Sequence, residues 1–261
     1  MNKPRPWLYW AVLSVLCLLG VSCCKQQQKD PFRYKVAIIG NPSNPDIRYD
    51  ESQMQALKNL GYNTLQLNIA WGARPADEPL NLEDILYVDG IGSREKADQR
   101  LQAIKERARI AKKWGFRTLF HFGAPRVDSL YKILTPDLID IATEKNSIQK
   151  KEIVDKYVSL LKRLKQEVPE LDDIEVYTFD QDAWVANEFG NGPTDRDIPL
   201  HERIPAFLQA LTGAWAEVSP DGMVWWEPWE ISAGQIYACI PSLPTRNFGM
   251  FLHSNIAEVQ L

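Results

Sequence analysis

The feature of this 261-residue chain that most constrains its fold is a repeated alternation of short apolar runs and longer amphipathic stretches, which starts at Tyr34. This alternation predicts parallel strands joined by crossover helices, because a chain needs a long connection to return to the same end of a parallel sheet. The predicted strands are residues 35–40, 62–70, 116–122, 174–179, 223–226 and 247–252.

Apolar residues at helical spacing and clear start and stop signals predict the connecting helices. Asp50 is suited to cap the first helix, and Gly61 and Gly115 stand where helices end in a left-handed residue. The predicted helices are residues 50–60, 94–114, 147–168 and 200–218.

The loops that follow the strands favour an α/β fold of the (β/α)8 TIM-barrel type. They are rich in polar and aromatic residues, which places function on one face. Pro42, Asn44 and Pro45 follow the first strand, where a doubly wound dinucleotide-binding sheet would carry a glycine-rich turn. A closed barrel needs eight strands and about 250 residues. Since only about six strands are recognised, the sequence predicts either a barrel truncated after about six strands or a compact variant.

Composition indicates one globular domain without a nucleic-acid partner. The chain is 45% hydrophobic and 25% charged, and its net charge of -4 comes from interspersed acids and bases without a basic stripe. The predicted organisation is a signal peptide with its lipidation site at 1–23, a tether at 24–33 and the barrel domain at 34–261.

The N-terminus has the pattern of a bacterial export signal. Lys3 and Arg5 precede an apolar run over residues 7–21, and Ser22 precedes Cys23 and Cys24. This arrangement resembles a lipoprotein box with lipidation at Cys23, although Gly20 stands where such boxes usually carry leucine, and Cys24 is the alternative. It predicts a lipid-anchored protein of the bacterial cell envelope, at the outer membrane or the cell surface. An ordinary secretory signal is the second interpretation.

The four cysteines leave no disulfide framework in the mature domain, because Cys239 is the only one beyond the processing site. No cysteine and histidine spacing matches a zinc site. We therefore expect no metal and no other cofactor.

Carboxylates follow two neighbouring predicted strands. Asp180 and Asp182 come after the fourth strand, and Glu227 and Glu230 after the fifth. Glycosidic bond cleavage needs two carboxyl groups that flank the bond, one as proton donor and the other as nucleophile or base. Asp182 or Asp180 is the predicted donor and Glu227 the predicted nucleophile or base. The alternative for any one acid is a helix cap or a pair with Arg196, Arg203 or Arg246.

Aromatic side chains beside these acids are suited to stacking against sugar rings. The predicted substrate contacts are Trp71, His121, Trp184, Trp229, Glu230 and His253. Trp114, Trp215 and His201 lie within or at the start of helices and are predicted to be structural.

The segment from Tyr177 to Leu208, with Asp180-Gln181-Asp182-Ala183-Trp184 and the helix start at Pro199, resembles barrel domains of bacterial glycoside hydrolase-like lipoproteins. Over residues 34–261 the chain is similar in general to hexosaminidase-like and glucuronidase-like barrels. Its acids stand as Asp180, Gln181, Asp182, whereas hexosaminidases carry an adjacent Asp and Glu. The resemblance implies hydrolysis of an extracellular or periplasmic glycan by carboxylate catalysis. A non-catalytic glycan-binding lipoprotein and an inactive fragment of a longer hydrolase are the alternatives.

Overall fold

The computed structural model describes residues 32–40, 48–69, 77–126, 145–177, 194, 197–228 and 231–252. Packing divides the chain into two units, Met1–Tyr34 and Lys35–Leu261. Only residues 32–34 of the first unit are described, so the architecture below is that of the second unit. Among the described residues, no helix has the length and apolar character needed to cross a bilayer.

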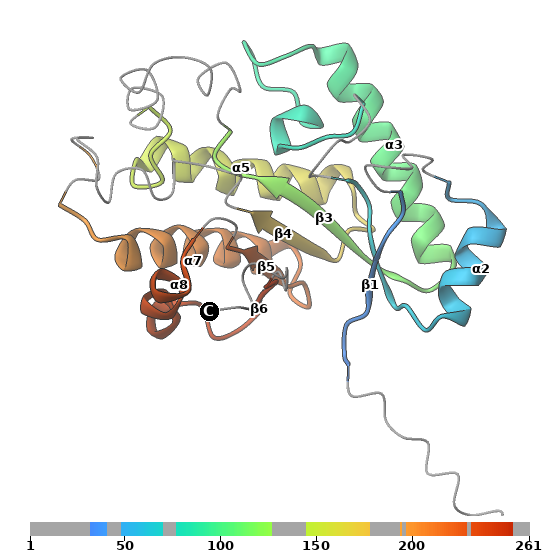
Figure 1. Cartoon of the computed structure of the whole chain (residues 1–261). Helices are drawn as coiled ribbons and strands as arrows, with labels where there is room; N and C mark the ends of the chain where they lie inside the picture. The colour runs from blue at the N-terminus through green and yellow to red at the C-terminus, as the bar shows by residue number, and fades with distance from the viewer. Residues whose placement is uncertain are drawn as a thin grey trace, which may run out of the picture. The chain divides into compact units, whose positions relative to one another are not determined.

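The described part of the second unit is built on one parallel sheet of six strands, which Figure 1 shows from its strand side. Neighbours in sequence are neighbours in the sheet, so the strand order never reverses. A doubly wound sheet reverses its order at a switch point, whereas a barrel winds in one direction. The predicted fold class, a partial (β/α) barrel, is confirmed. The strands are β1 Val36–Ile38, β2 Thr64–Gln66, β3 Arg117–Gly123, β4 Asp173–Tyr177, β5 Val224–Glu227 and β6 Phe248–Met250.

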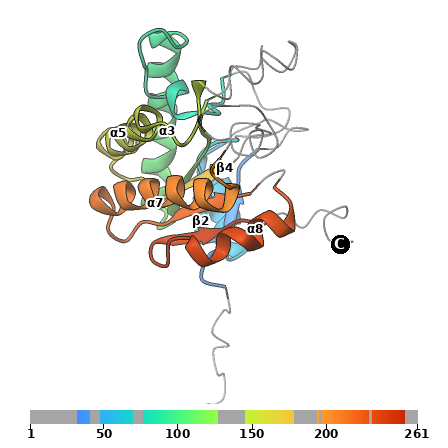
Figure 2. The same cartoon turned by 90° about the vertical axis from the view of Figure 1, so that its left-hand side faces the viewer.

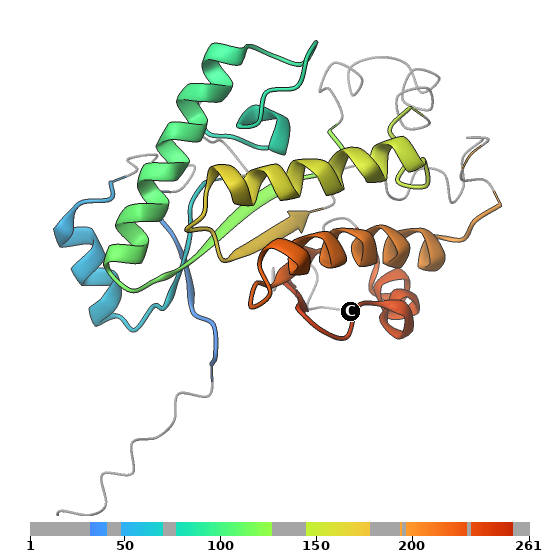
Figure 3. The ribbon, with the colours of Figure 1, turned by 180° about the vertical axis from the view of Figure 1, so that it is seen from behind.

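Long helices connect the strands, and α3, α5 and α7 lie together on one side of the sheet (Figures 2 and 3). The α-helices are α2 Glu51–Asn59, α3 Arg94–Lys113, α5 Lys151–Glu167, α7 Leu200–Val218 and α8 Ala233–Cys239. Two short 3-10 helices, η1 Leu82–Asp84 and η4 Ile240–Ser242, complete the described elements. The predicted 200–218 helix matches α7 in full, and the predicted 50–60 and 94–114 helices match α2 and α3 to within a residue at each end.

Local chemistry explains the helix boundaries. The Asp50 carboxylate accepts a hydrogen bond from the Gln53 backbone N–H at 2.9 Å, which caps α2 as predicted. Gly61 and Gly115 adopt φ of +83° and +72° just beyond α2 and α3, a conformation that favours glycine. Helix α8 was not among the sequence predictions. It begins at a capping box formed by Ser232 and Gln235.

The strands show the period of two that a sheet imposes on its side chains. Residues that point toward the helices are buried and apolar, and they join the α2, α3, α5 and α7 side chains in one core. Examples from consecutive strands are Ala37, Leu65, Phe120, Ile174 and Trp226. The opposite face, called the inner face below, carries buried polar residues on the same strands.

Tryptophans predicted to be structural lie in the core. Trp215 is fully buried on α7 and donates its indole N–H to the Asp172 carbonyl at 3.1 Å. Trp114 is partly buried against the same core. His201, predicted to be structural, is exposed at the start of α7.

Candidate active site on the inner face

Three ionisable side chains from adjacent strands meet on the inner face of the sheet. His121 lies on β3 and Glu175 on β4, and these two residues are partners in the strand register. Glu227 is the last residue of β5 and pairs with Tyr177, two residues beyond Glu175 on the same face. All three are almost completely buried, with exposed fractions of 1%, 4% and 4%. We call these residues the inner-face triad.

The triad is compact enough for its members to share protons. His121 Nε2 lies 2.8 Å from Glu227 Oε2, and one ligand atom of Glu175 lies within 4.8 Å of both partners. Burial raises the pKa of Glu175 to about 7, helped by the Glu227 charge and opposed by that of His121. Burial lowers the pKa of His121, but the charges of Glu175 and Glu227 outweigh it and leave this pKa above its ordinary value. The triad therefore holds exchangeable protons near neutral pH.

A second layer of polar residues on β2 and just beyond it fixes the histidine. The Gln66 amide nitrogen donates to the Asn68 carbonyl at 2.8 Å and lies 3.4 Å from His121 Nδ1. The Asn68 side chain bonds to the His121 backbone on both sides, accepting from its N–H at 3.1 Å and donating to its carbonyl at 2.8 Å. The imidazole is thus contacted by Gln66 from β2 and by Glu227 from β5.

A cavity of about 220 Å³ lies against the triad. Its remaining lining comes from Val36, Ile38, Gln66, Phe251 and Leu252. The half-buried Trp225 lies beside this lining, with its ring centroid 5.0 Å from that of Phe251. Gly249 makes room for the indole, because a Cβ at this position would come within 2.3 Å of the ring. The inner face therefore combines carboxyl groups with an aromatic surface.

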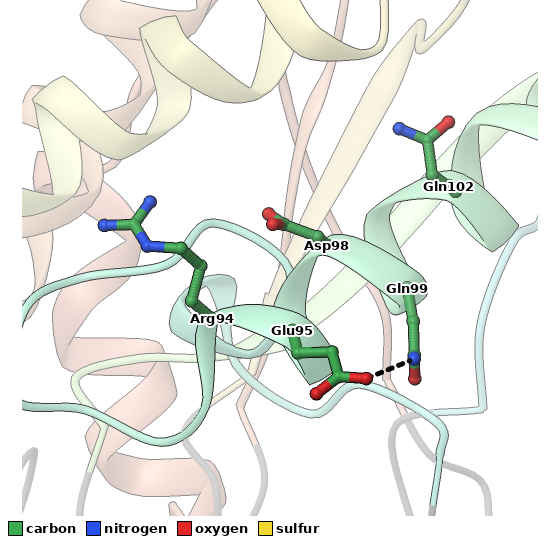
Figure 4. Close-up of a pocket in the computed structure, with 5 residues that line it drawn as sticks. All are labelled: Arg94, Glu95, Asp98, Gln99 and Gln102. Atoms are coloured by element: carbon green, nitrogen blue, oxygen red, sulfur yellow. Dashed lines mark hydrogen bonds between the residues drawn. The ribbon is translucent and has the colours of Figure 1, made fainter.

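A larger hollow of about 590 Å³ lies on the outer side of α3. Figure 4 shows its lining residues, Arg94, Glu95, Asp98, Gln99 and Gln102, which all come from this one helix. All five are exposed. Ligand sites usually converge from several elements and bury their ligand. We therefore place the candidate site at the smaller cavity on the inner face.

The triad also contains the donor types that bind divalent cations. A coordinating histidine must present a lone pair to the metal. The Gln66 amide group offers only N–H bonds toward His121 Nδ1, so Nδ1 accepts and the neutral ring carries its hydrogen on Nε2. Since Nε2 is the atom that faces Glu227, the hydrogen bonding favours proton sharing over metal binding.

Two of the sequence-predicted site residues, Glu227 and His121, come together in the triad. The other predicted site positions lie outside the described residues: Cys23, Trp71, Asp180, Asp182, Trp184, Trp229, Glu230 and His253. Glu175 and the supporting Gln66 lie within the predicted strands at 174–179 and 62–70, and neither is among the predicted site residues. The sequence does contain a signal for Glu175. It is a carboxylate inside a strand, and the period of two places it on the same face as Asp173 and Tyr177.

No protein-family model and no curated protein sequence matches this chain. Solved structures do match its fold. An O-GlcNAc hydrolase from Thermobaculum terrenum superimposes with a TM-score of 0.53 and 15% identity, over 85% of this chain and 41% of that chain. Endo-glycoceramidase II from Rhodococcus sp. gives a TM-score of 0.47 and 11% identity, over 87% of this chain and 59% of that chain.

The likeness to the O-GlcNAc hydrolase shows the fold class. The described part of this chain therefore has the fold of a (β/α) barrel, and the chain spans less than half the length of that enzyme. At 15% identity the likeness extends to fold alone.

Proposed function

We propose that this chain is a glycoside hydrolase that cleaves an extracellular or periplasmic glycan on the inner face of its barrel. The observation that supports this activity most is the pair of buried carboxyl groups, Glu175 and Glu227, which face one cavity from adjacent strands. Glycosidases need one protonated and one ionised carboxyl group beside the scissile bond. The raised pKa of Glu175, about 7, is consistent with such a division.

In this proposal Glu227 is the nucleophile or base. It is 4% exposed, lies at the carboxyl end of β5 and lines the cavity. Catalytic residues of TIM barrels come from this end of the strands. Asp180 and Asp182 remain proposed proton donors, because they follow the end of β4 at Tyr177 and β4 is the neighbour of β5.

The proposed substrate is a carbohydrate that stacks on aromatic side chains. Trp225 and Phe251 supply an aromatic surface beside the cavity, and His121 supplies a polar contact. Trp71, Trp184, Trp229, Glu230 and His253 remain proposed contacts on the grounds of sequence.

The experiment is a glycan-hydrolysis panel on the purified chain and on the variants Glu227→Gln and Asp182→Asn. We expect Glu227→Gln to lower kcat/KM by about 1000-fold or more, since acid and base groups contribute about 100- to 10,000-fold. Glu95→Gln removes an exposed carboxylate from α3 and serves as a control with unchanged turnover. Unchanged turnover in both site variants would overturn the assigned roles. Glycan binding without turnover in the unaltered chain would favour the non-catalytic alternative.

We also propose that the protein is exported and anchored in the bacterial cell envelope through a lipid on Cys23. The support is the sequence pattern of residues 1–23. Metabolic labelling with a fatty-acid analogue tests it. Label should be lost in Cys23→Ala and kept in Cys24→Ala, and the reverse result would assign the lipid to Cys24.

A further inference from the structure

Gln66 determines which nitrogen of His121 carries the hydrogen. Its amide group has two N–H bonds, one directed to the Asn68 carbonyl at 2.8 Å and the other toward His121 Nδ1 at 3.4 Å. Because an amide nitrogen accepts no hydrogen bond, Nδ1 must be the acceptor. The neutral imidazole therefore exists as the Nε2–H form.

This tautomer places an N–H group in close contact with Glu227. His121 Nε2 lies 2.8 Å from Glu227 Oε2, and it carries a hydrogen in both the neutral and the charged ring. A donor group or a positive charge this close to a buried carboxyl group favours its charged form. Glu227 is therefore stabilised as the carboxylate throughout the titration of the histidine.

Glu175 lies in a different environment within the same cavity. It faces Glu227 and His121 from the middle of β4, with one carboxylate oxygen within 4.8 Å of their ligand atoms. Two carboxyl groups this close do not both ionise readily in a buried site. Since His121 stabilises Glu227 as the anion, the remaining proton falls on Glu175.

We propose that His121, oriented by Gln66, is a positioning residue that keeps Glu227 ionised, and that Glu175 is the group that protonates the departing glycosidic oxygen. This inference rests on the proposed hydrolase function. It assigns the role of proton donor to Glu175, a residue within β4, and no longer to Asp180 or Asp182.

The separation of the two carboxyl groups determines the reaction sequence. One carboxylate oxygen of Glu175 and one of Glu227 lie within 4.8 Å of each other. Carboxyl groups about 5 Å apart act by direct attack, whereas a water molecule between them needs a wider gap. A Glu227 oxygen forms a bond to the anomeric carbon as the glycosidic C–O bond breaks. The bond's electron pair goes to the leaving oxygen, which takes the Glu175 proton. Water then attacks the anomeric carbon, returns a proton to Glu175 and releases Glu227 as the carboxylate, so the configuration of the sugar is retained.

The first test does not depend on turnover. Nitrogen-15 NMR of the imidazole groups distinguishes the two tautomers, and the chain has only three histidines. We expect the Nε2–H form for His121 in the unaltered chain and a partial shift to Nδ1–H in Gln66→Met, which removes the amide donor. His201 is exposed on α7 and serves as the internal control. An Nδ1–H form in the unaltered chain, or a Zn²⁺-dependent shift of Nε2, would overturn the inference.

The second test uses glycosides that differ in leaving group. A dinitrophenyl glycoside needs little protonation as it departs, whereas an alkyl or sugar leaving group needs it fully. We expect Glu175→Gln to lower kcat/KM by about 100-fold or more on the second type and far less on the first. Equal losses on both types would overturn the role of Glu175.

Asp173→Asn is the matched control because Asp173 lies on the same strand and face but pairs with Arg117. It should leave the leaving-group dependence unchanged. If the unaltered chain hydrolyses no glycoside, the proposed function fails, and the NMR result still decides whether Gln66 and His121 are arranged as inferred.

Discussion

The two ends of the inner face use the same residue types for different purposes. Strand β4 places Asp173 and Glu175 two residues apart on one face, and both are buried. At the amino end, Arg117 donates two hydrogen bonds to Asp173, at 2.6 Å and 3.0 Å, and the Met223 backbone N–H adds a third at 2.9 Å. Glu175 has the inner-face neighbours His121 and Glu227 instead.

This difference separates a structural acid from a candidate chemical one. Burial raises the pKa of Asp173, and the hydrogen bonds and fixed positive charge of Arg117 oppose that rise. A buried carboxyl group beside a second carboxylate and a titratable histidine has neighbours whose own charges change near neutral pH. Burial alone therefore does not identify the active carboxyl group, and the charge of the neighbours does.

The largest effect on stability should come from breaking the structural pair. Arg117→Met leaves the buried Asp173 without its guanidinium, which should lower the free energy of unfolding by about 3 kcal/mol. Urea denaturation measures it. The nitrogen-15 signals of the His121 imidazole should still show the Nε2–H tautomer, because Arg117 lies at the amino end of the strands, away from the triad. A stability loss below about 1 kcal/mol would remove the contrast between the two ends.

The next effect is a dependence of stability on pH that originates in Glu175. Its pKa rises from 4.5 in the unfolded chain to about 7 in the fold, so the proton stabilises the folded state. This contribution is complete below the unfolded value and is lost as the pH rises through about 7. The free energy of unfolding should fall by on the order of 2 kcal/mol between about pH 5 and pH 8.

The raised pKa of His121 acts in the same direction, since a charged ring is favoured in the fold. Glu175→Gln mimics the protonated carboxyl group and should flatten the pH dependence. Urea melts of both proteins at the two pH values make the comparison. If the free energy of unfolding of Glu175→Gln depends on pH as steeply as that of the unaltered chain, the titrating group is not Glu175.

A smaller effect should follow from filling the space beside Trp225. In Gly249→Ala the new Cβ would come within 2.3 Å of the indole, so the ring must move. We expect a loss of about 1 to 2 kcal/mol, typical of overpacking. If Trp225 contributes to the binding surface, Gly249→Ala should also lower the affinity for glycan. Arg117→Met is the control and should leave this affinity unchanged. Calorimetric binding measurements and thermal melts report the two effects separately.

The smallest effect on stability should come from a solvent-exposed ion pair near the amino end of the strands. Lys112 Nζ lies 2.9 Å from Asp172 Oδ2, with side-chain exposed fractions of 39% and 22%. Solvent-screened pairs contribute little, so Lys112→Met should cost about 0.5 kcal/mol in urea denaturation. A cost near that of Arg117→Met would mean that burial of the acid does not explain the strength of the Asp173 pair.

The helices were easier to predict than the site. Asp50, Gly61 and Gly115 act through contacts within a few residues, so their effect is visible in the sequence. Helix α8 was missed, although its capping box at Ser232 and Gln235 is a sequence-level signal. The stretch between the predicted strand at 62–70 and the predicted helix at 94–114 reads as a loop, yet Leu82–Asp84 form η1 and Leu80, Leu82, Ile85 and Leu86 are buried.

Two of the predicted site residues, Glu227 and His121, lie together in the inner-face triad, whereas its third member, Glu175, is not among the predicted site residues. Glu227 stood out because it ends an apolar run beside tryptophan. Glu175 did not stand out, because no residue near it in the sequence indicates a function for a single acid inside a strand. Its significance comes from the register that sets it opposite His121, and register depends on pairing between distant segments.

The sequence by itself determined the α/β alternation, the helix ends and the presence of acids beside aromatic residues, because propensities, caps and periodicity act over short distances. Only the tertiary structure decided which face each strand residue occupies and which acid has which neighbour. Asp173 and Glu175 are indistinguishable as buried strand acids until β3 brings Arg117 to one and His121 to the other. Charge interactions depend on distance in space, and the fold alone sets that distance.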